Sequence, residues 1–307
     1  MRIMRWRTLA AVAATAGALT LAPTAAPAAA PRTGAAAGVV AVDSAVAVVV
    51  AQTKSTFNPG NIISDDSFFN PDAMSAADIQ LFLDDRSCQR QDSTPCLAHY
   101  RVDTPSLPAS AGRCTALRGA RNERASSIIA RVAQACTISP RVLLVLLQKE
   151  QSLLTAPSAS GYQKATGYAC PDTAACDAKY FGFFNQVYRA AWQFREYTVH
   201  PKDWRYKIGT NRIQYHPNAS CGAGKVRIVN QATANLYNYT PYQPNKETLT
   251  DPQGGDACSA FGNLNFSRLY NQWFGSPLKV RFTGWDSSCL NYTGGFGCPP
   301  IQPFNGV

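Results

Sequence analysis

The sequence offers little material for a metal centre. Its three histidines, His99, His200 and His216, stand singly, and its ten cysteines include no C-x-x-C pair. Zinc sites usually draw on closely spaced cysteines and histidines. We therefore expect no metal and no cofactor, and we interpret the histidines as ordinary surface or packing residues.

Several catalytic signatures are also missing. The sequence has no G-x-S-x-G elbow, no P-loop and no H-E-x-x-H helix, which disfavours the enzyme classes that those motifs define. The apolar run at 38–51 carries Asp43 and is too short to cross a bilayer. We therefore expect no membrane span.

The N-terminus is typical of an export signal. Three arginines among the first residues precede an apolar stretch at 9–21, and the small residues PTAAPAAA follow. These are the basic, apolar and cleavage regions of a secretory signal. We predict a signal peptide at 1–30, with cleavage as late as Ala51 as the alternative. The mature protein is then expected to be secreted and extracellular.

All ten cysteines lie beyond the predicted signal. An even number of cysteines in an exported chain indicates disulfides. The sequence does not choose among the possible pairings. We take adjacent cysteines that close short loops as the default, with Cys170–Cys176 as the clearest case.

The chain is basic, with a net charge of +10. A basic exported protein suits an anionic partner such as a bacterial cell wall, whereas nucleic acid is not an expected partner outside the cell. A solvated basic surface without a specific partner explains the same charge. Charge alone does not separate the two interpretations.

Composition divides the remainder of the chain into four parts. Residues 31–56 form an alanine-rich, low-complexity linker. Residues 57–112 form a small N-terminal module that is too short for a large core of its own. The main domain covers 113–278, and the C-terminal tail, 279–307, is expected to form a β-hairpin closed by Cys289–Cys298.

Apolar periodicity predicts a helix-dominated α+β fold with a small β-sheet. Ser75 and Asp78 have the spacing of a capping box at the start of a short helix. The helices are expected at 74–87, 121–136, 139–154, 182–200, 230–239 and 263–275, and the strands at 204–209, 211–216 and 225–230.

The helix SPRVLLVLLQKEQSLL, 139–154, carries one carboxylate in its apolar stripe. Ser139 is the expected N-cap, with Pro140 at the first helical position. Glu150 falls on the face of the leucines, where burial favours a protonated acid, which is the form that general-acid catalysis needs. Lys149 points about 100° away and is not expected to reach it.

Three short segments occur in a known order. LLQKEQS, FGFFNQ and LYNYTPYQPN together resemble the lysozyme-like superfamily, in particular lytic transglycosylases and goose-type lysozymes, over about residues 114–275. The resemblance implies that Glu150 is the catalytic acid. The sequence departs from the family pattern at Gln151, which stands where transglycosylases have serine, at an extra residue, Asn185, and at Leu236 in place of alanine.

The chain also resembles exported actinobacterial proteins that share its N-terminal module, and that resemblance implies a cell-wall-associated location. The lysozyme-like resemblance implies an exported, peptidoglycan-cleaving glycosidase, which we expect to be a monomer. It would cut the glycan β-1,4 bond with Glu150 as a single acid and base, as a lytic transglycosylase or a muramidase. Asp172 and Asp177 are the candidates for a second carboxylate, and we interpret both as turn residues. The rival hypothesis is a non-catalytic wall-binding or adhesion protein on the same fold. A third hypothesis, a wall enzyme that cleaves peptide bonds, is disfavoured because the sequence shows no nucleophile or metal set for it. The expected substrate-binding residues are Gln186, Tyr237, Asn238, Phe183 and Tyr239.

Overall fold

A computed structural model describes residues 57–171, 174–251 and 254–280 of the 307-residue chain. The predicted signal peptide at 1–30, the linker at 31–56 and the hairpin closed by Cys289–Cys298 lie outside the described residues. Those three assignments stay predictions, as does the division between 57–112 and 113–278.

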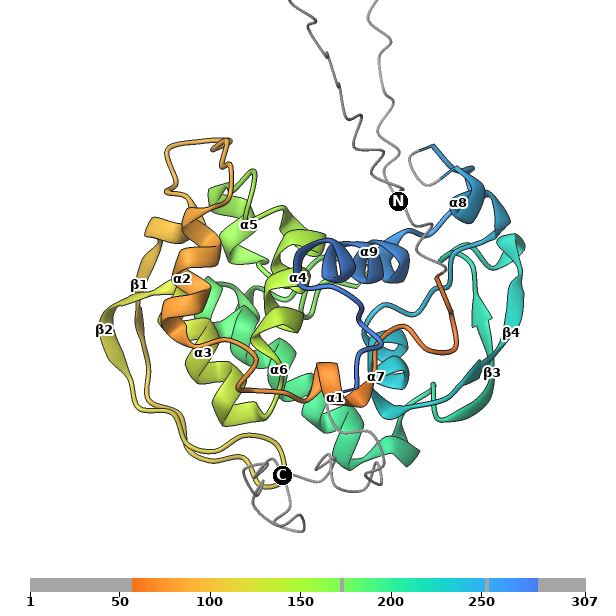
Figure 1. The fold of residues 1–307 in the computed structure, drawn as a ribbon, viewed down its shortest axis with the longest axis horizontal. Helices are drawn as coiled ribbons and strands as arrows, with labels where there is room; N and C mark the ends of the chain where they lie inside the picture. The colour runs from red at the N-terminus through yellow and green to blue at the C-terminus, as the bar shows by residue number, and fades with distance from the viewer. Residues whose placement is uncertain (1–56, 172–173, 252–253, 281–307) are drawn as a thin grey trace, which may run out of the picture. The chain divides into compact units, whose positions relative to one another are not determined.

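The described part of the chain contains nine α-helices and two antiparallel sheets of two strands each (Figure 1). The predicted class, helix-dominated α+β, is therefore confirmed. The elements are α1 (Asp65–Phe68), α2 (Ala76–Asp84), β1 (Arg101–Thr104), β2 (Ala120–Arg124), α3 (Ala125–Cys136), α4 (Pro140–Gln151), α5 (Ala159–Gln163), α6 (Phe183–Val199), β3 (Gly209–Gln214), β4 (Ala223–Ile228), α7 (Gln231–Tyr239), α8 (Lys246–Thr250) and α9 (Gly262–Phe274).

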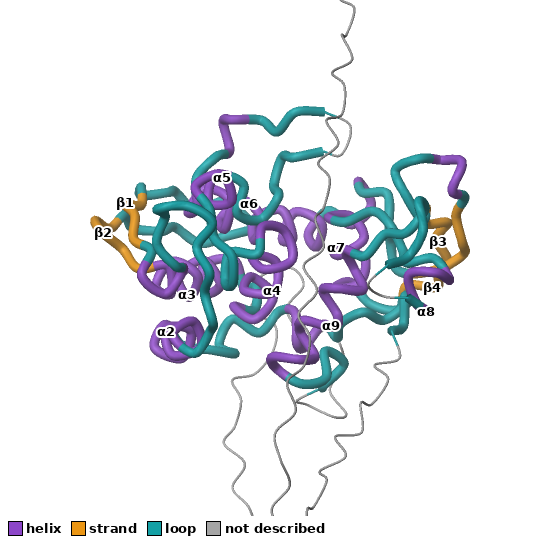
Figure 2. Tube along the Cα trace, turned by 90° about the horizontal axis from the view of Figure 1, so that it is seen from above, coloured by secondary structure: helices purple, strands orange, loops and turns teal. Residues whose placement is uncertain are grey.

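Helix α4 lies at the centre of the helical layer, with α9 alongside it (Figures 1 and 2). Every side chain from Val142 to Leu147 is at most 1% exposed, so the helix is buried around its whole girth. Pro140 occupies the first turn as expected, but Ser139 makes no side-chain cap, and its hydroxyl is buried without a hydrogen-bond partner among the described residues. The predicted capping box at Ser75 and Asp78 is present at α2.

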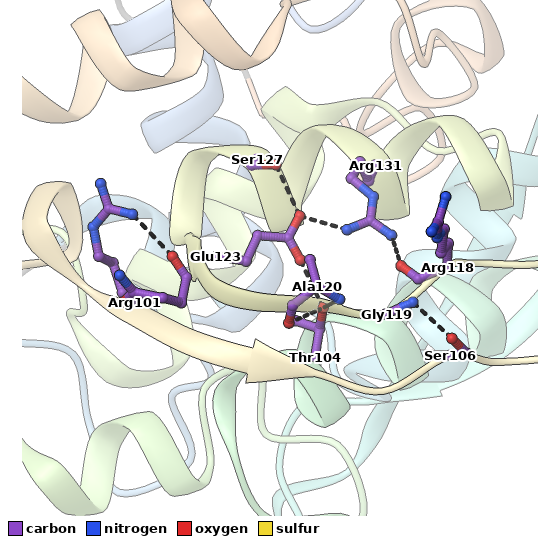
Figure 3. Close-up of polar contacts among 10 residues, drawn as sticks. Arg101, Thr104, Ser106, Arg118, Gly119, Ala120, Glu123, Ser127 and Arg131 are labelled. Carbon is purple, nitrogen blue, oxygen red and sulfur yellow. Dashed lines mark hydrogen bonds and ion pairs between the residues drawn. The ribbon is translucent and has the colours of Figure 1, made fainter.

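The hairpin β1–β2 was not expected, because its polar sequence ARNER has the spacing of a helix start. Strand β2 instead pairs with β1, and α3 begins only at Ala125. Glu123 fixes this arrangement, accepting hydrogen bonds from Thr104 Oγ1 (2.7 Å), Ser127 Oγ (2.8 Å) and Arg131 Nη1 (2.6 Å), as Figure 3 shows. One carboxylate therefore joins β1, β2 and α3.

Strands β3 and β4 match two of the three predicted strands. They pair antiparallel from Gly209 opposite Ile228 to Gln214 opposite Ala223. The segment 204–209 is not a strand before Gly209. The reason is that Asn238 takes over its backbone groups: Asn238 Oδ1 accepts from Tyr206 N (2.9 Å), and Nδ2 donates to Tyr206 O (2.9 Å).

Four disulfides lie in the described residues, and all four join adjacent cysteines: Cys88–Cys96, Cys114–Cys136, Cys170–Cys176 and Cys221–Cys258. The default pairing is confirmed for these eight cysteines. Disulfides on this scale are typical of secreted, extracellular proteins. No helix of the described ranges is long and apolar enough to cross a bilayer.

Candidate functional site

Glu150 lies at the carboxyl end of α4, where the buried part of the helix ends and a cleft begins. Its side chain is 24% exposed, and its Oε1 is in direct ion-pair contact with Lys149 Nζ. Lys149 also donates to Thr240 Oγ1 (3.1 Å), just after α7. The expectation that Lys149 points away is wrong, because its long side chain bends back and is held by Thr240. Glu150 therefore faces a cation, and not the apolar surroundings that its position in the leucine stripe predicted.

A glycine and a tyrosine close the other sides of Glu150. Gly167 has φ +70°, and a Cβ added there would lie 3.1 Å from Glu150 Oε2. Tyr239 Oη donates to the carbonyl oxygen of Thr166 (2.8 Å). Burial, and to a lesser extent the negative charge of Glu150, raises the pKa of Tyr239 well above its usual value. The loop at 165–171 therefore lies against the carboxylate, and Tyr239 holds it there through Thr166.

The Lys149–Glu150 pair opens into a cleft of about 650 Å³. A volume of this size falls in the ordinary range for ligand sites. The cleft combines the ion pair with hydroxyl and amide groups and with two tyrosine rings. Its lining comprises Lys149, Glu150, Gln151, Gly167, Cys170, Pro171, Asn238, Tyr239, Thr240, Pro241, Tyr242, Gly262 and Asn265.

A second hollow of about 410 Å³ adjoins this cleft. The two share Gly167, Cys170, Pro171 and Tyr239, so they form neighbouring parts of one groove. Cys170, in the shared wall, is bonded to Cys176. The remaining lining of the second hollow is Tyr168, Ala169, Gln193, Tyr197 and Trp204.

One nitrogen donor in the wall of the second hollow lacks a partner. Trp204 Nε1 is buried and makes no hydrogen bond within the described part of the chain. Gln193 is 9% exposed, and its amide interacts with the hydroxyl of Tyr197 and lowers the pKa of that group, although burial raises it more. A buried donor without an acceptor costs free energy, so the wall favours a ligand that brings carbonyl oxygens.

Gln186, an expected substrate ligand, lies in the core at 0% exposure. Its Oε1 accepts from Thr166 N (3.2 Å), Thr166 Oγ1 (3.2 Å) and Tyr168 N (3.1 Å), while Nε2 donates to Tyr168 O (3.0 Å) and Tyr180 O (2.8 Å). Its amide is therefore fully used in holding Thr166, Tyr168 and Tyr180 against α6.

Phe183 and Asn238 also serve the fold. Phe183 is 1% exposed, and its ring packs edge-on against Tyr100 and Tyr162. The amide of Asn238 is bonded to the backbone of Tyr206, although Asn238 also belongs to the lining of the cleft.

The two tyrosines of the third segment differ in their access. Tyr237 is 0% exposed, its hydroxyl has no hydrogen-bond partner in the described ranges, and burial raises its pKa. Tyr239 lines both hollows. Of the expected site residues, the structure therefore brings Glu150, Asn238 and Tyr239 together at the cleft and places Gln186, Phe183 and Tyr237 in the core.

The remaining candidates lie apart from the cleft or outside the described residues. Asp177 Oδ1 accepts from Lys179 N (3.0 Å) as the cap of a short 3-10 turn, in keeping with its interpretation as a turn residue. Asp172 is not described. No group of three or more His, Cys, Asp or Glu that could hold a metal ion is found among residues 57–171, 174–251 and 254–280.

A family model described as "LasA, N-terminal domain" matches residues 61–286, well over half of the chain. The protein belongs to this family. Comparison with curated proteins and with solved structures finds no match.

The family overturns the resemblance to lysozyme-like enzymes. LasA is a staphylolytic protease, and its family is associated with peptidases that act on peptide bonds of peptidoglycan. The assignment to lytic transglycosylases or goose-type lysozymes is therefore wrong, and so is the prediction of a glycosidase that cuts the β-1,4 bond. The role of Glu150 as a glycosidase acid falls with it.

The structure gives the physical reason for the error. The three matching segments are short, and most of their side chains serve packing: Gln186 fastens a loop, Asn238 braces Tyr206, and Phe183 fills the core. A buried helix that ends on a polar residue is likewise common to many folds. Such segments reflect the needs of a helical core and carry little information on chemistry.

Proposed function

We propose that this protein is an exported member of the LasA family that serves peptide-bond cleavage in the bacterial cell wall, and that its cleft binds the peptide part of peptidoglycan. The observation that carries the proposal is the family match over residues 61–286, which is to a non-glycosidase family associated with wall peptidases. Within this function, we assign binding of the wall peptide to the described residues.

The cleft supports a peptide ligand. A peptide offers a carbonyl and an N–H at each residue, and wall peptides also carry free amino and carboxylate groups. Glu150 presents a carboxylate acceptor and Lys149 an ammonium donor at the same place. In the adjoining hollow, Trp204 Nε1 is a donor without an acceptor among the described residues, and Gln193 lines the same wall. Small rotations of these two side chains would let them bind carbonyl oxygens of an extended chain.

The test compares two forms of the same wall. The full exported chain is mixed with intact insoluble peptidoglycan and with glycan strands from which the peptides have been removed, and the bound fraction is measured. We expect binding to the intact wall only. Glu150→Gln should weaken it by about tenfold or more, since a charge-assisted hydrogen bond contributes about 1.5–3 kcal/mol.

Glu196→Gln is the matched control. Glu196 also forms an ion pair, with Arg113, and its side chain is 16% exposed, but it does not line the cleft. The control should bind as the parent does. Equal binding of the parent to peptide-free glycan, or equal loss in both variants, would contradict the proposal. Cleavage of the bound wall by a LasA-type peptidase should release new amino groups, because peptide bonds are cut. It should release no new reducing ends, because the glycan bonds stay intact.

A further inference from the structure

The outward face of the β3–β4 hairpin concentrates positive charge. Arg212 lies directly opposite Lys225 in the antiparallel register, and Thr210 lies opposite Arg227. All four side chains are exposed, while the alternate residues of the hairpin, Ile213, Val226 and Ile228, are buried. Three cations therefore share one face, which we call the basic face (Arg212, Lys225 and Arg227).

No carboxylate of the described residues forms an ion pair with the basic face. None of its three cations has an ion-pair or hydrogen-bond partner among the described residues. Between Asp203 and Glu247 the sequence contains six Lys and Arg residues and no Asp or Glu.

The loop that the Cys221–Cys258 disulfide ties to the hairpin carries three carboxylates, those of Glu247, Asp251 and Asp256. Asp251 Oδ1 accepts a hydrogen bond from Gly254 N, and Asp256 Oδ1 accepts from Asn245 Nδ2, Cys258 N and Ser259 Oγ. The cations of the basic face are therefore without an ion-pair partner among the described residues.

Like charges opposite one another in a sheet destabilise the pair. The Arg212–Lys225 pair thus costs stability in the free protein, and an anion bound across the two strands would remove that cost. Ile208 and Val229, 58% and 52% exposed, follow directly at the open end of the hairpin and add apolar surface beside the cations. The surface suits a ligand with regularly spaced anions on an aliphatic backbone.

We propose that the basic face binds a linear phosphate-bearing polymer, separately from the peptide cleft. Arginine guanidinium groups match phosphate oxygens in a bidentate geometry, and a lysine adds a point charge between them. Arg227 lies two residues beyond Lys225 on β4, about 7 Å further along the strand. Successive phosphates of one extended chain therefore meet successive cations. The positive net charge of the protein attracts the polymer, and the basic face of the hairpin is the site at which it binds.

The probe is inorganic polyphosphate of defined length, titrated against the full exported chain at several salt concentrations. The test variant combines Arg212→Ser, Lys225→Ser and Arg227→Ser, which are surface changes that leave the buried side of the hairpin intact. The matched control combines Arg118→Ser, Arg121→Ser and Arg124→Ser. It removes the same charge from exposed positions in and before β2, on the other side of the described unit (Figures 1 and 2).

We expect the test variant to lose affinity for polyphosphate by about tenfold or more. The slope of log K against log salt should also become shallower by about 2, because each lost phosphate contact removes about 0.7 from it. The control should keep the parent slope. Equal losses in both variants would overturn the proposal in favour of a general effect of net charge. Unchanged polyphosphate binding with weakened binding to phosphatidylglycerol vesicles would overturn it in favour of a lipid surface. Glu150→Gln should leave polyphosphate binding unchanged, which separates this test from that of the peptide cleft.

Discussion

Gly167 lies against the carboxyl group of Glu150, so close that a Cβ at this glycine would be 3.1 Å from Oε2. The backbone of Gly167 also has φ +70°, a conformation that residues with a side chain rarely adopt. One glycine thus meets two requirements, a left-handed turn and space for the carboxylate of α4.

Gly167→Ala should therefore affect both stability and the cleft. We expect a loss of about 1–2 kcal/mol from the left-handed backbone, together with weaker binding of wall peptide because Glu150 must move. Gly112→Ala is the control, since Gly112 has the same φ of +70° and an added Cβ would meet only Val199 at 3.8 Å. Denaturant unfolding should show similar losses in both variants. Weaker peptide binding should appear in Gly167→Ala alone, and its absence there would count against the cleft.

Removal of the hydroxyl group should affect the free energy of unfolding differently at Tyr237 and at Tyr239. Tyr237 Oη is buried without a described partner, so Tyr237→Phe should leave the free energy of unfolding unchanged or raise it, because an unmet polar group costs about 1–3 kcal/mol. Tyr239→Phe removes the hydrogen bond to Thr166 O and should cost about 1 kcal/mol. Thermal or denaturant unfolding measures both. A clear loss of stability or of peptide binding in Tyr237→Phe would show that its hydroxyl has a partner.

Much of the fold was predictable because it depends on local sequence. The capping box of α2, the apolar girth of α4, and Gly275 at the end of α9 act within a few residues of the elements that they define. The hairpin β1–β2 was missed for the opposite reason. Its polar residues become a strand through Glu123, whose partner Thr104 lies 19 residues away in the sequence.

The site was less predictable because its contacts are distant in sequence. Helical geometry placed Glu150 correctly on α4, but its surroundings depend on Thr240 after α7 and on Gly167 in a loop. The donors of Gln193 and Trp204 become visible only when α6 and the segment after it are folded together. The sequence carried no spacing signal for such pairs, whereas the short lysozyme-like segments supplied a misleading one.

Glu123 gives a prediction on pH. Burial raises the pKa of this carboxyl, but the hydrogen bonds from Thr104, Arg131 and Ser127 and the positive charge of Arg131 lower it more, so the pKa lies below its usual value. A carboxyl with a lowered pKa stabilises the fold above the pKa of the unfolded chain and loses that contribution as pH falls through the folded value. The stability difference between the parent and Glu123→Gln should therefore be largest near neutral pH and shrink below about pH 4. Urea unfolding at a series of pH values measures it, and a difference independent of pH would contradict the assignment.

The disulfides should contribute unequally to stability, in the order of the loops that they close. Cys221–Cys258 spans 37 residues, and Cys170–Cys176 spans only 6. If a disulfide acts mainly by restricting the unfolded chain, the first contributes about 4 kcal/mol and the second about 2 kcal/mol. Replacing each pair by alanines should therefore lower the free energy of unfolding more for Cys221–Cys258.

The smaller loop should matter more for binding, because Cys170 lines both parts of the groove and Cys221 lines neither. The variant without Cys170–Cys176 should stay folded and bind wall peptide weakly, whereas the variant without Cys221–Cys258 should be less stable but bind normally at temperatures where it is folded. Paired measurements of unfolding and of wall binding test both statements. Normal binding without Cys170–Cys176 and weak binding without Cys221–Cys258 would mean that the wall peptide binds near the β3–β4 hairpin. That result would contradict the assignment of the cleft beside Glu150 as the peptide site.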